Sequence, residues 1–273
     1  MAVTASLRMP QAPPDRAPAP ALRRWLMAIA ALVFAMIVVG GATRLTDSGL
    51  SITEWRPIMG AVPPLTGADW ADAFAKYKQI PEYKLVNKGM SLDQFKVIFW
   101  WEWAHRFLGR IIGVAFLMPF LIFLARGLIN RALLPKLVGL FALGALQGAV
   151  GWYMVQSGLV DRIDVSQYRL ALHLTIAFVI LGCALWLIFS LGTVRAAIRL
   201  DTVPVAALWR ARLLLGLVFL QTVLGGFVAG LKAGLSHNTW PLMDGRIVPS
   251  GLWVMSPWYL NLFENVMTVQ FMH

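Results

Sequence analysis

Two side chains that can do proton or metal chemistry lie at the start of a long apolar segment. The sequence Trp-Trp-Glu-Trp-Ala-His-Arg places Glu102 and His105 at the mouth of an apolar run that ends near Ala125. Ionisable groups within a hydrophobic span are costly, so their default interpretation is functional. On a helix, a spacing of three puts the carboxylate and the imidazole on one face. Gly109 and Gly113 follow His105 at steps of four, which predicts a smooth strip where a flat ligand could lie.

The composition indicates a membrane protein. Hydrophobic residues make up 59% of the 273 residues and charged residues only 14%, far from the soluble average. A spanning helix needs about 20 apolar residues, so we expect an all-α polytopic fold. The expected spans are 25–42, 101–125, 137–155, 170–191 and 213–231, with a sixth that starts near Phe263 and is cut off by the chain end. The proline-rich residues 1–22 are predicted to be a disordered tail.

The net charge of +11 is concentrated on one side of these spans. Eleven of the 24 basic residues lie in the N-terminal tail and in the connections 126–136 and 195–212, where only Asp15 and Asp201 oppose them. This is the positive-inside pattern, and it predicts a cytoplasmic N-terminus. Because membrane topology accounts for nearly all of the excess positive charge, the charge does not indicate nucleic-acid binding.

Three histidines align in this topology. The connection 43–94 is then a long outer loop, and His105, His173 and His273 each fall early in a span that enters from the outer surface. All three are therefore expected at similar depth in the outer leaflet. His237 lies in a loop and is interpreted as a loop residue.

An internal repeat relates two parts of the chain at an offset of 185 residues. The matched residues are Gly40-Gly41 with Gly225-Gly226, Gly49-Leu50-Ser51 with Gly234-Leu235-Ser236, Trp55 with Trp240, Gly60 with Gly245 and Pro64 with Pro249. After a shorter loop the register resumes with Glu102 and His105 opposite Gln270 and His273. We expect a first four-helix repeat over 23–192 and a truncated second repeat over 193–273, with further spans, and a partner for His273, beyond the chain.

Two imidazoles facing each other across a four-helix bundle are suited to axial ligation of haem iron. Zinc is less favoured, because it would need three or four closely placed ligands and the chain has no Cys/His cluster. Cys183 is the only cysteine, so no disulfide or CxxC pair forms within the chain. The open alternatives are that each histidine only hydrogen-bonds across the bundle, and that Glu102 is an interfacial carboxylate paired with Arg106 or Lys96.

Several ordered motifs resemble the haem A synthase family, and the resemblance covers the chain from about Arg23 to its end. The motifs are 40–51 (GGATRLTDSGLS) with Trp55, Pro57 and Gly60, then 102–110 (EWAHRFLGR), 146–148 (LQG) with 151–152 (GW), and 169–173 (RLALH). Because the chain lacks the cysteine pair that some members carry in the first outer loop, it resembles the cysteine-free branch common in proteobacteria and mitochondria.

The resemblance implies an eight-helix enzyme of two similar four-helix halves, with about five and a half spans present here. It implies oxidation of the methyl group of haem O to the formyl group of haem A, which is supplied to cytochrome c oxidase. It also implies that His105 and His173 face the substrate haem, that His273 is one axial ligand of a haem b cofactor, and that the enzyme lies in the bacterial inner membrane.

We predict Glu102 to be the catalytic residue, placed to stabilise developing positive charge or to handle the proton of an attacking water. Expected partners are haem O, haem A, the enzyme that makes haem O, membrane lipid and an unidentified electron acceptor; a homo-oligomer is left open. Four arginines are candidates either for haem propionates or for snorkelling to the interface: Arg44, Arg106, Arg110 and Arg169. The alternative functions are a haem b electron-transfer subunit without substrate chemistry and a proton-coupled transporter that uses Glu102 as its relay.

Overall fold

The computed structural model describes residues 20–160, 162–191 and 203–273. Within these residues, five helices are long and apolar enough to cross a membrane. They are α1 (Pro20–Leu45), α4 (Leu92–Ala125), α5 (Leu134–Val160), α6 (Gln167–Ser190) and α8 (Val205–Gly230). The predicted all-α polytopic fold is confirmed. Residues 1–19 of the predicted disordered tail lie outside the described residues, and Pro20 already begins α1.

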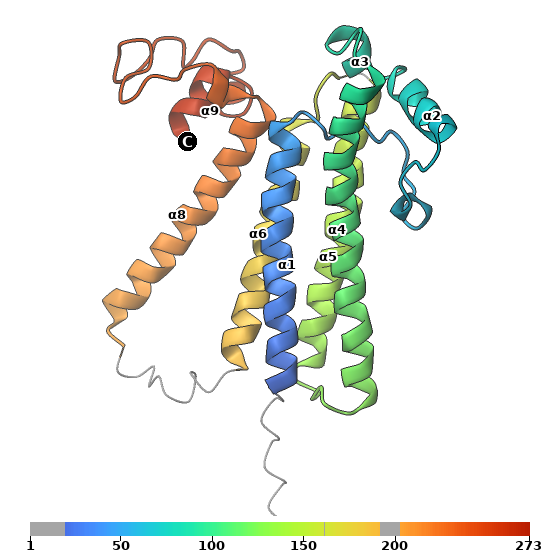
Figure 1. Ribbon diagram of the computed structural model, residues 1–273. Helices are drawn as coiled ribbons and strands as arrows, with labels where there is room; N and C mark the ends of the chain where they lie inside the picture. Colours follow the sequence, from blue (N-terminus) through green and yellow to red (C-terminus); the bar gives the residue numbers. More distant parts are fainter. Residues whose placement is uncertain (1–19, 161, 192–202) are drawn as a thin grey trace, which may run out of the picture.

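The first four long helices form a closed bundle (Figure 1). Contacts run from α1 to α4, from α4 to α5, from α5 to α6, and from α6 back to α1. Therefore α4 and α6 are one diagonal pair of the bundle, and α1 and α5 are the other. The shorter helices α2 (Gly67–Tyr77), α3 (Pro81–Leu85) and α9 (Val266–Met272) all lie at the upper end in Figure 1, which we call the loop end.

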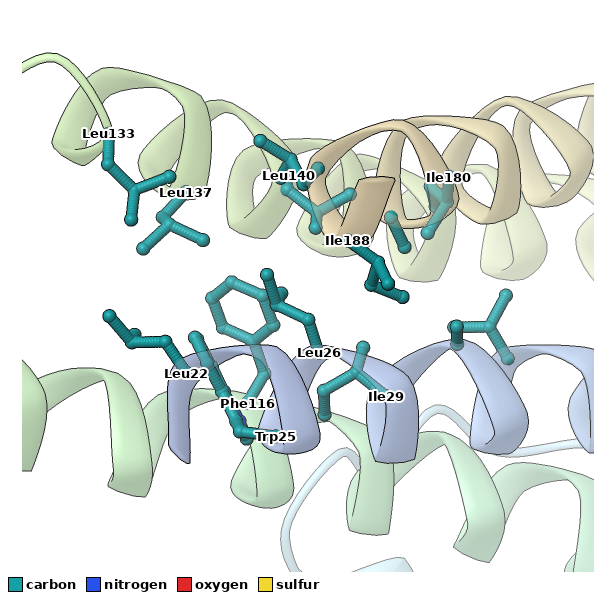
Figure 2. Packing of buried hydrophobic residues seen from close by; sticks show 14 of the residues in the cluster. Leu22, Trp25, Leu26, Ile29, Phe116, Leu133, Leu137, Leu140, Ile180 and Ile188 are labelled. Atoms are coloured by element: carbon teal, nitrogen blue, oxygen red, sulfur yellow. The ribbon is translucent and has the colours of Figure 1, made fainter. Parts of the chain in front are cut away.

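Away from the loop end, apolar side chains fill the bundle (Figure 2). Each of the four helices contributes to this cluster, with Leu22, Leu26 and Ile29 from α1, Phe116 from α4, Leu137 and Leu140 from α5, and Ile180 and Ile188 from α6. Pro119 inside α4 has no N–H, so the carbonyl of Ala115 loses its usual helical partner. The indole Nε1 of Trp25 donates to that carbonyl at 2.9 Å. Apolar packing therefore joins the helices here, and polar chemistry belongs nearer the loop end.

Helix α4 begins at Leu92, well before the predicted start of its span at residue 101. A capping box starts it: the Ser91 side chain accepts from the N–H of Gln94, and the Gln94 side chain accepts from the N–H of Ser91. At about 1.5 Å per residue, a helix of 34 residues is roughly 50 Å long. Since the hydrocarbon core is about 30 Å thick, the first turns of α4 extend beyond it.

The connection predicted as a long loop over 43–94 is partly helical. A second capping box, formed by Thr66 and Asp69, starts α2, and the short α3 follows. Phe74 and Tyr77 of α2 pack against Phe95 in the extended start of α4, with ring centroids 4.9 and 5.2 Å apart. This segment is therefore a folded cap on the loop end.

Helix α8 approaches α6 near the loop end and diverges from it toward the other end (Figure 1). The approach is close because α8 has glycine there: a Cβ on Gly226 would lie 2.8 Å from Cα of Ala171, and one on Gly230 would lie 2.6 Å from Cα of Gln167. The sixth apolar segment, predicted to start near Phe263, forms α9 from Val266 onward.

Candidate functional site

The two histidines of the first bundle each lie against a glycine of a neighbouring helix. A Cβ on Gly40 of α1 would lie 3.0 Å from Nε2 of His105, and a Cβ on Gly151 of α5 would lie 2.8 Å from Cε1 of His173. His105 comes from α4 and His173 from α6, the diagonal pair of the bundle. The glycines come from the other diagonal pair. Four different helices thus contribute to the site: two provide an imidazole, and two provide a glycine whose backbone lies against it.

The same contact recurs for the third histidine. A Cβ on Gly225 of α8 would lie 3.1 Å from Cε1 of His273, and Gly225 is the repeat counterpart of Gly40. His237 lies in the loop after α8, as predicted, where its Nδ1 lies 3.1 Å from Oδ1 of Asp244. The described geometry therefore relates His105 to His273 and keeps His237 apart from them.

Glu102 is buried, with 2% of its surface exposed, and three donors surround its carboxylate. Its Oε2 accepts from the Ser51 hydroxyl and from the backbone N–H of Ile52, both at 2.7 Å. Its Oε1 accepts from Nη2 of Arg106 at 2.5 Å. Because an ionised carboxylate offers about four lone-pair positions, roughly one acceptor position is left. The side chain is a fixed anion three residues before His105.

Arg106 and Arg110 continue this polar row along α4. Arg106 donates to the carbonyls of Ile52 and Glu54 at 2.8 and 3.1 Å. Arg110 donates to the carbonyls of Pro57 and Arg56 at 2.8 and 3.0 Å. Together with Glu102, these arginines fasten residues 51–57 along the helix. Their observed partners are therefore loop carbonyls, which is a third role beside the two expected from the sequence.

The second half repeats the loop contact with reversed polarity. Gln270 occupies the position of Glu102 and donates through Nε2 to the carbonyl of His237 at 2.7 Å. His237 is the repeat counterpart of Ile52, whose N–H donates to Glu102. Both halves therefore have a hydrogen bond at this position, but the Glu102 carboxylate accepts it in the first half, whereas the neutral Gln270 amide donates it in the second.

An ion cluster at the loop end was not foreseen from the sequence. Nη1 of Arg44 lies 3.0 Å from Oδ1 of Asp47 and 3.4 Å from Oδ1 of Asp164. Nζ of Lys232, just after α8, lies 2.9 and 3.3 Å from the same two oxygens. Nε of Arg44 also donates to the carbonyl of Ala229, its own repeat counterpart, at 2.9 Å. The cluster ties α8 to α1 and to the α5–α6 connection.

Comparison with known proteins decides the family. A model of the COX15-CtaA family, described as cytochrome oxidase assembly protein, matches residues 23–273. The chain is 55% identical over 253 residues to the heme A synthase of Parvibaculum lavamentivorans, which covers 93% of this chain and 72% of the relative. It is 56% identical over 255 residues to that of Azorhizobium caulinodans, covering 93% and 72%. The chain belongs to the haem A synthase family. No solved structure matches it.

The residues of this haem A synthase family member fit a haem at the predicted histidines. Nδ1 of His173 and Oε1 of Gln147 are buried and have no hydrogen-bond partner among the described residues. The glycine beside each of the three histidines leaves the ring free of a Cβ contact, and a planar macrocycle needs such space. Neutral imidazole nitrogens are common axial ligands of haem iron. The donor set, the unpaired ring nitrogen and the cleared backbone therefore all suit the group.

Proposed function

We propose that this chain oxidises the methyl group of haem O to the formyl group of haem A by successive hydroxylations, as an oxidoreductase acting on a CH or CH₂ group. The observation that carries the proposal is the arrangement around α4. His105 and His173 come from diagonal helices, each beside a glycine, and the buried anion Glu102 is fixed three residues before His105. An electron carrier without substrate chemistry has no need for such a charge in one half only.

In this proposal, His105 and His173 bind the iron of the substrate haem between them. The Glu102 carboxylate is held by Ser51, Ile52 and Arg106, so it cannot swing away from developing positive charge near His105. A fixed charge costs no reorganisation during the reaction. The remaining acceptor position on Oε1 can receive a proton from an attacking water. Burial keeps bulk water from screening the charge.

His273 would supply one axial ligand of a haem b cofactor in the second half, and that haem would provide one-electron transfer when bound. Two features favour this assignment: His273 has the repeat position of His105, and Gln270 leaves the second half without a buried carboxylate there. The proposed organisation is a first repeat over 23–192 and a second that begins at 193.

We place the protein in a bacterial inner membrane with its N-terminus in the cytoplasm. The charge balance supports this orientation. At the end of the helices opposite the loop end (Figure 1), the described residues include no acidic residue and these seven basic ones: Arg23, Arg24, Arg126, Arg131, Lys136, Arg210 and Arg212. Because haem O is strongly apolar, we further propose that this protein acts in close association with the membrane enzyme that makes haem O.

The test is to replace Glu102 with Gln in the complete protein, to extract the haems from the cells and to separate them by chromatography. We expect haem A to fall and haem O to accumulate, because the variant keeps the size of the side chain and loses its charge. Glu54→Gln is the matched control, since Glu54 is an exposed carboxylate in the same cap. Undiminished haem A without haem O accumulation in Glu102→Gln would refute the catalytic assignment.

The haem b assignment has its own test. His273→Met in the full-length protein should change the haem b spectrum, because a thioether would replace an imidazole at the iron. An unchanged spectrum would remove His273 as a ligand.

A further inference from the structure

Two glutamines each contact the main chain and one ring nitrogen of a histidine, although the ring nitrogen differs between them. Nε2 of Gln147 on α5 donates to the main-chain carbonyl of His173 at 3.0 Å and lies 3.4 Å from its ring Nε2. Nε2 of Gln221 on α8 donates to the main-chain oxygen of His273, the last residue of the sequence, at 2.6 Å and lies 2.8 Å from its ring Nδ1. In each case, one amide touches both the backbone and the ring of the histidine on the adjacent helix.

Each glutamine is followed four residues later by the glycine that lies beside the same ring. These pairs are Gln147 with Gly151 and Gln221 with Gly225. A spacing of four places both members on one helix face, one turn apart. The amide therefore fixes the histidine backbone on one side, and the glycine clears space for the ring one turn away. Together, the glutamine and the glycine fix where the imidazole lies along the neighbouring helix and in which direction it points; we call such a pair a glutamine–glycine pair.

The amide also has the chemistry that a metal-binding imidazole needs. When one ring nitrogen ligates a metal, the other carries a proton and usually donates it to a nearby acceptor, which sets the ring orientation. Nδ1 of His173 is buried without a partner among the described residues, so it is the ring nitrogen left free for a metal. Its Nε2 faces the side-chain amide of Gln147, whose Oε1 is a buried acceptor without a donor there. The glutamine thus combines a donor for the main chain with an unused acceptor near the ring nitrogen that would carry the proton.

His105 lacks this support. The residue four positions before its glycine, Gly40, is Met36, whose Cε would lie 3.3 Å from a Cβ on Gly109. A thioether has no donor for a carbonyl. The glutamine–glycine pair is therefore found at His173 and His273 and is absent at His105.

We infer that Gln147 and Gln221 are positioning residues that hold His173 and His273 in the orientation needed to ligate haem iron. This inference rests on the proposed function, in which those histidines are haem ligands. Gln147 acts on the substrate haem of the first half, and Gln221 acts on haem b of the second. Each glutamine should affect only its own haem.

The experiment uses the complete protein, purified in detergent, with Gln221→Leu, Gln221→Glu, Gln147→Leu and the control Gln156→Leu. Gln156 is an exposed glutamine on α5 without a side-chain hydrogen bond among the described residues. Haem b is measured as pyridine haemochrome per mole of protein, and its axial ligation by electron paramagnetic resonance. Binding of added haem O is measured by difference spectroscopy.

Gln221→Leu should retain haem b about 10- to 100-fold more weakly, as is typical when the hydrogen-bond partner of a metal ligand is lost, and should bind haem O normally. Gln147→Leu should show the converse, and Gln156→Leu should match the unmodified protein. Gln221→Glu keeps an acceptor and loses the amide donor, so it should keep haem b but shift its resonance signature.

If the leucine variant of Gln221 does not fold, the glutamate variant decides. A folded Gln221→Glu protein with an unaltered resonance signature would overturn the inference, as would leucine variants that weaken both haems or neither. Failure of the proposed function is distinguishable, because then His273→Met itself leaves the haem b spectrum unchanged. A changed His273→Met spectrum with unchanged glutamine variants would defeat the positioning role alone.

Discussion

Gly40→Ala should disturb the proposed substrate site although alanine favours helices. In a helix interior, the exchange of glycine for alanine normally stabilises by about 0.5–1 kcal/mol. Here the added Cβ would lie 3.0 Å from Nε2 of His105, whereas ordinary carbon contacts lie near 3.5–4.0 Å. The imidazole would have to move by roughly 0.5 Å, and forced overpacking of this kind costs about 1–3 kcal/mol.

The adjacent Gly41 supplies the matched control. It is exposed on the same helix, and a Cβ added to it meets no atom within 4 Å, so Gly41→Ala should gain only the propensity of alanine. The two variants should differ by about 1–3 kcal/mol in thermal stability measured in detergent. The ratio of haem A to haem O in cell extracts should fall only for Gly40→Ala, since small displacements of catalytic groups reduce rates. If both variants behave alike in both assays, the close contact between His105 and Gly40 does not shape the site.

Two further predictions concern the cap. Arg106→Met should destabilise the protein by about 3–5 kcal/mol, because it leaves the buried Glu102 carboxylate without its cation; proteolysis of the cap at increasing denaturant measures this, and a loss under about 1 kcal/mol would contradict the pairing. Burial, more than any other cause, raises the pKa of Glu82 in α3 from 4.5 to about 7. The folded state then binds the extra proton, so stability should decline as pH rises from about 4.5 and level off above about 7, by at most about 3 kcal/mol. Glu82→Gln should flatten this decline in thermal unfolding at pH 5 and pH 8, and an unchanged pH dependence would contradict it.

The sequence predicts the long helices well because their signal is apolar length. It is less informative about their ends. Residues 92–100 are too mixed in polarity to count as a membrane span, yet Ser91 and Gln94 form a capping box that starts α4 there. The same kind of signal, Thr66 followed by Asp69, marks α2 within the predicted loop. Attention to capping residues as well as hydropathy would have located both.

The candidate site is predictable in its residue types and less so in its contacts. Spacing alone places Glu102 and His105 on one face of α4, and the repeat identifies His273. The partners of Glu102 come from residues 51 and 52, and their arrival depends on how the cap folds. The contact between Gln147 and His173 depends in turn on the packing of α5 against α6. Long-range contacts of this kind have no local sequence signal.

The two halves share some features of the site and differ in one, the buried carboxylate. Both halves keep a histidine beside a glycine, and both keep a hydrogen bond between the connecting loop and the residue three positions before the histidine, which accepts in the first half and donates in the second. A neutral amide suffices for that bond, as Gln270 demonstrates in the second half. A buried carboxylate is the costlier solution, since it requires the guanidinium of Arg106 and two further donors. Because a neutral amide holds the loop in the second half, the charge of Glu102 is the feature on which the proposed reaction depends: a fixed carboxylate beside His105 would stabilise positive charge that develops there.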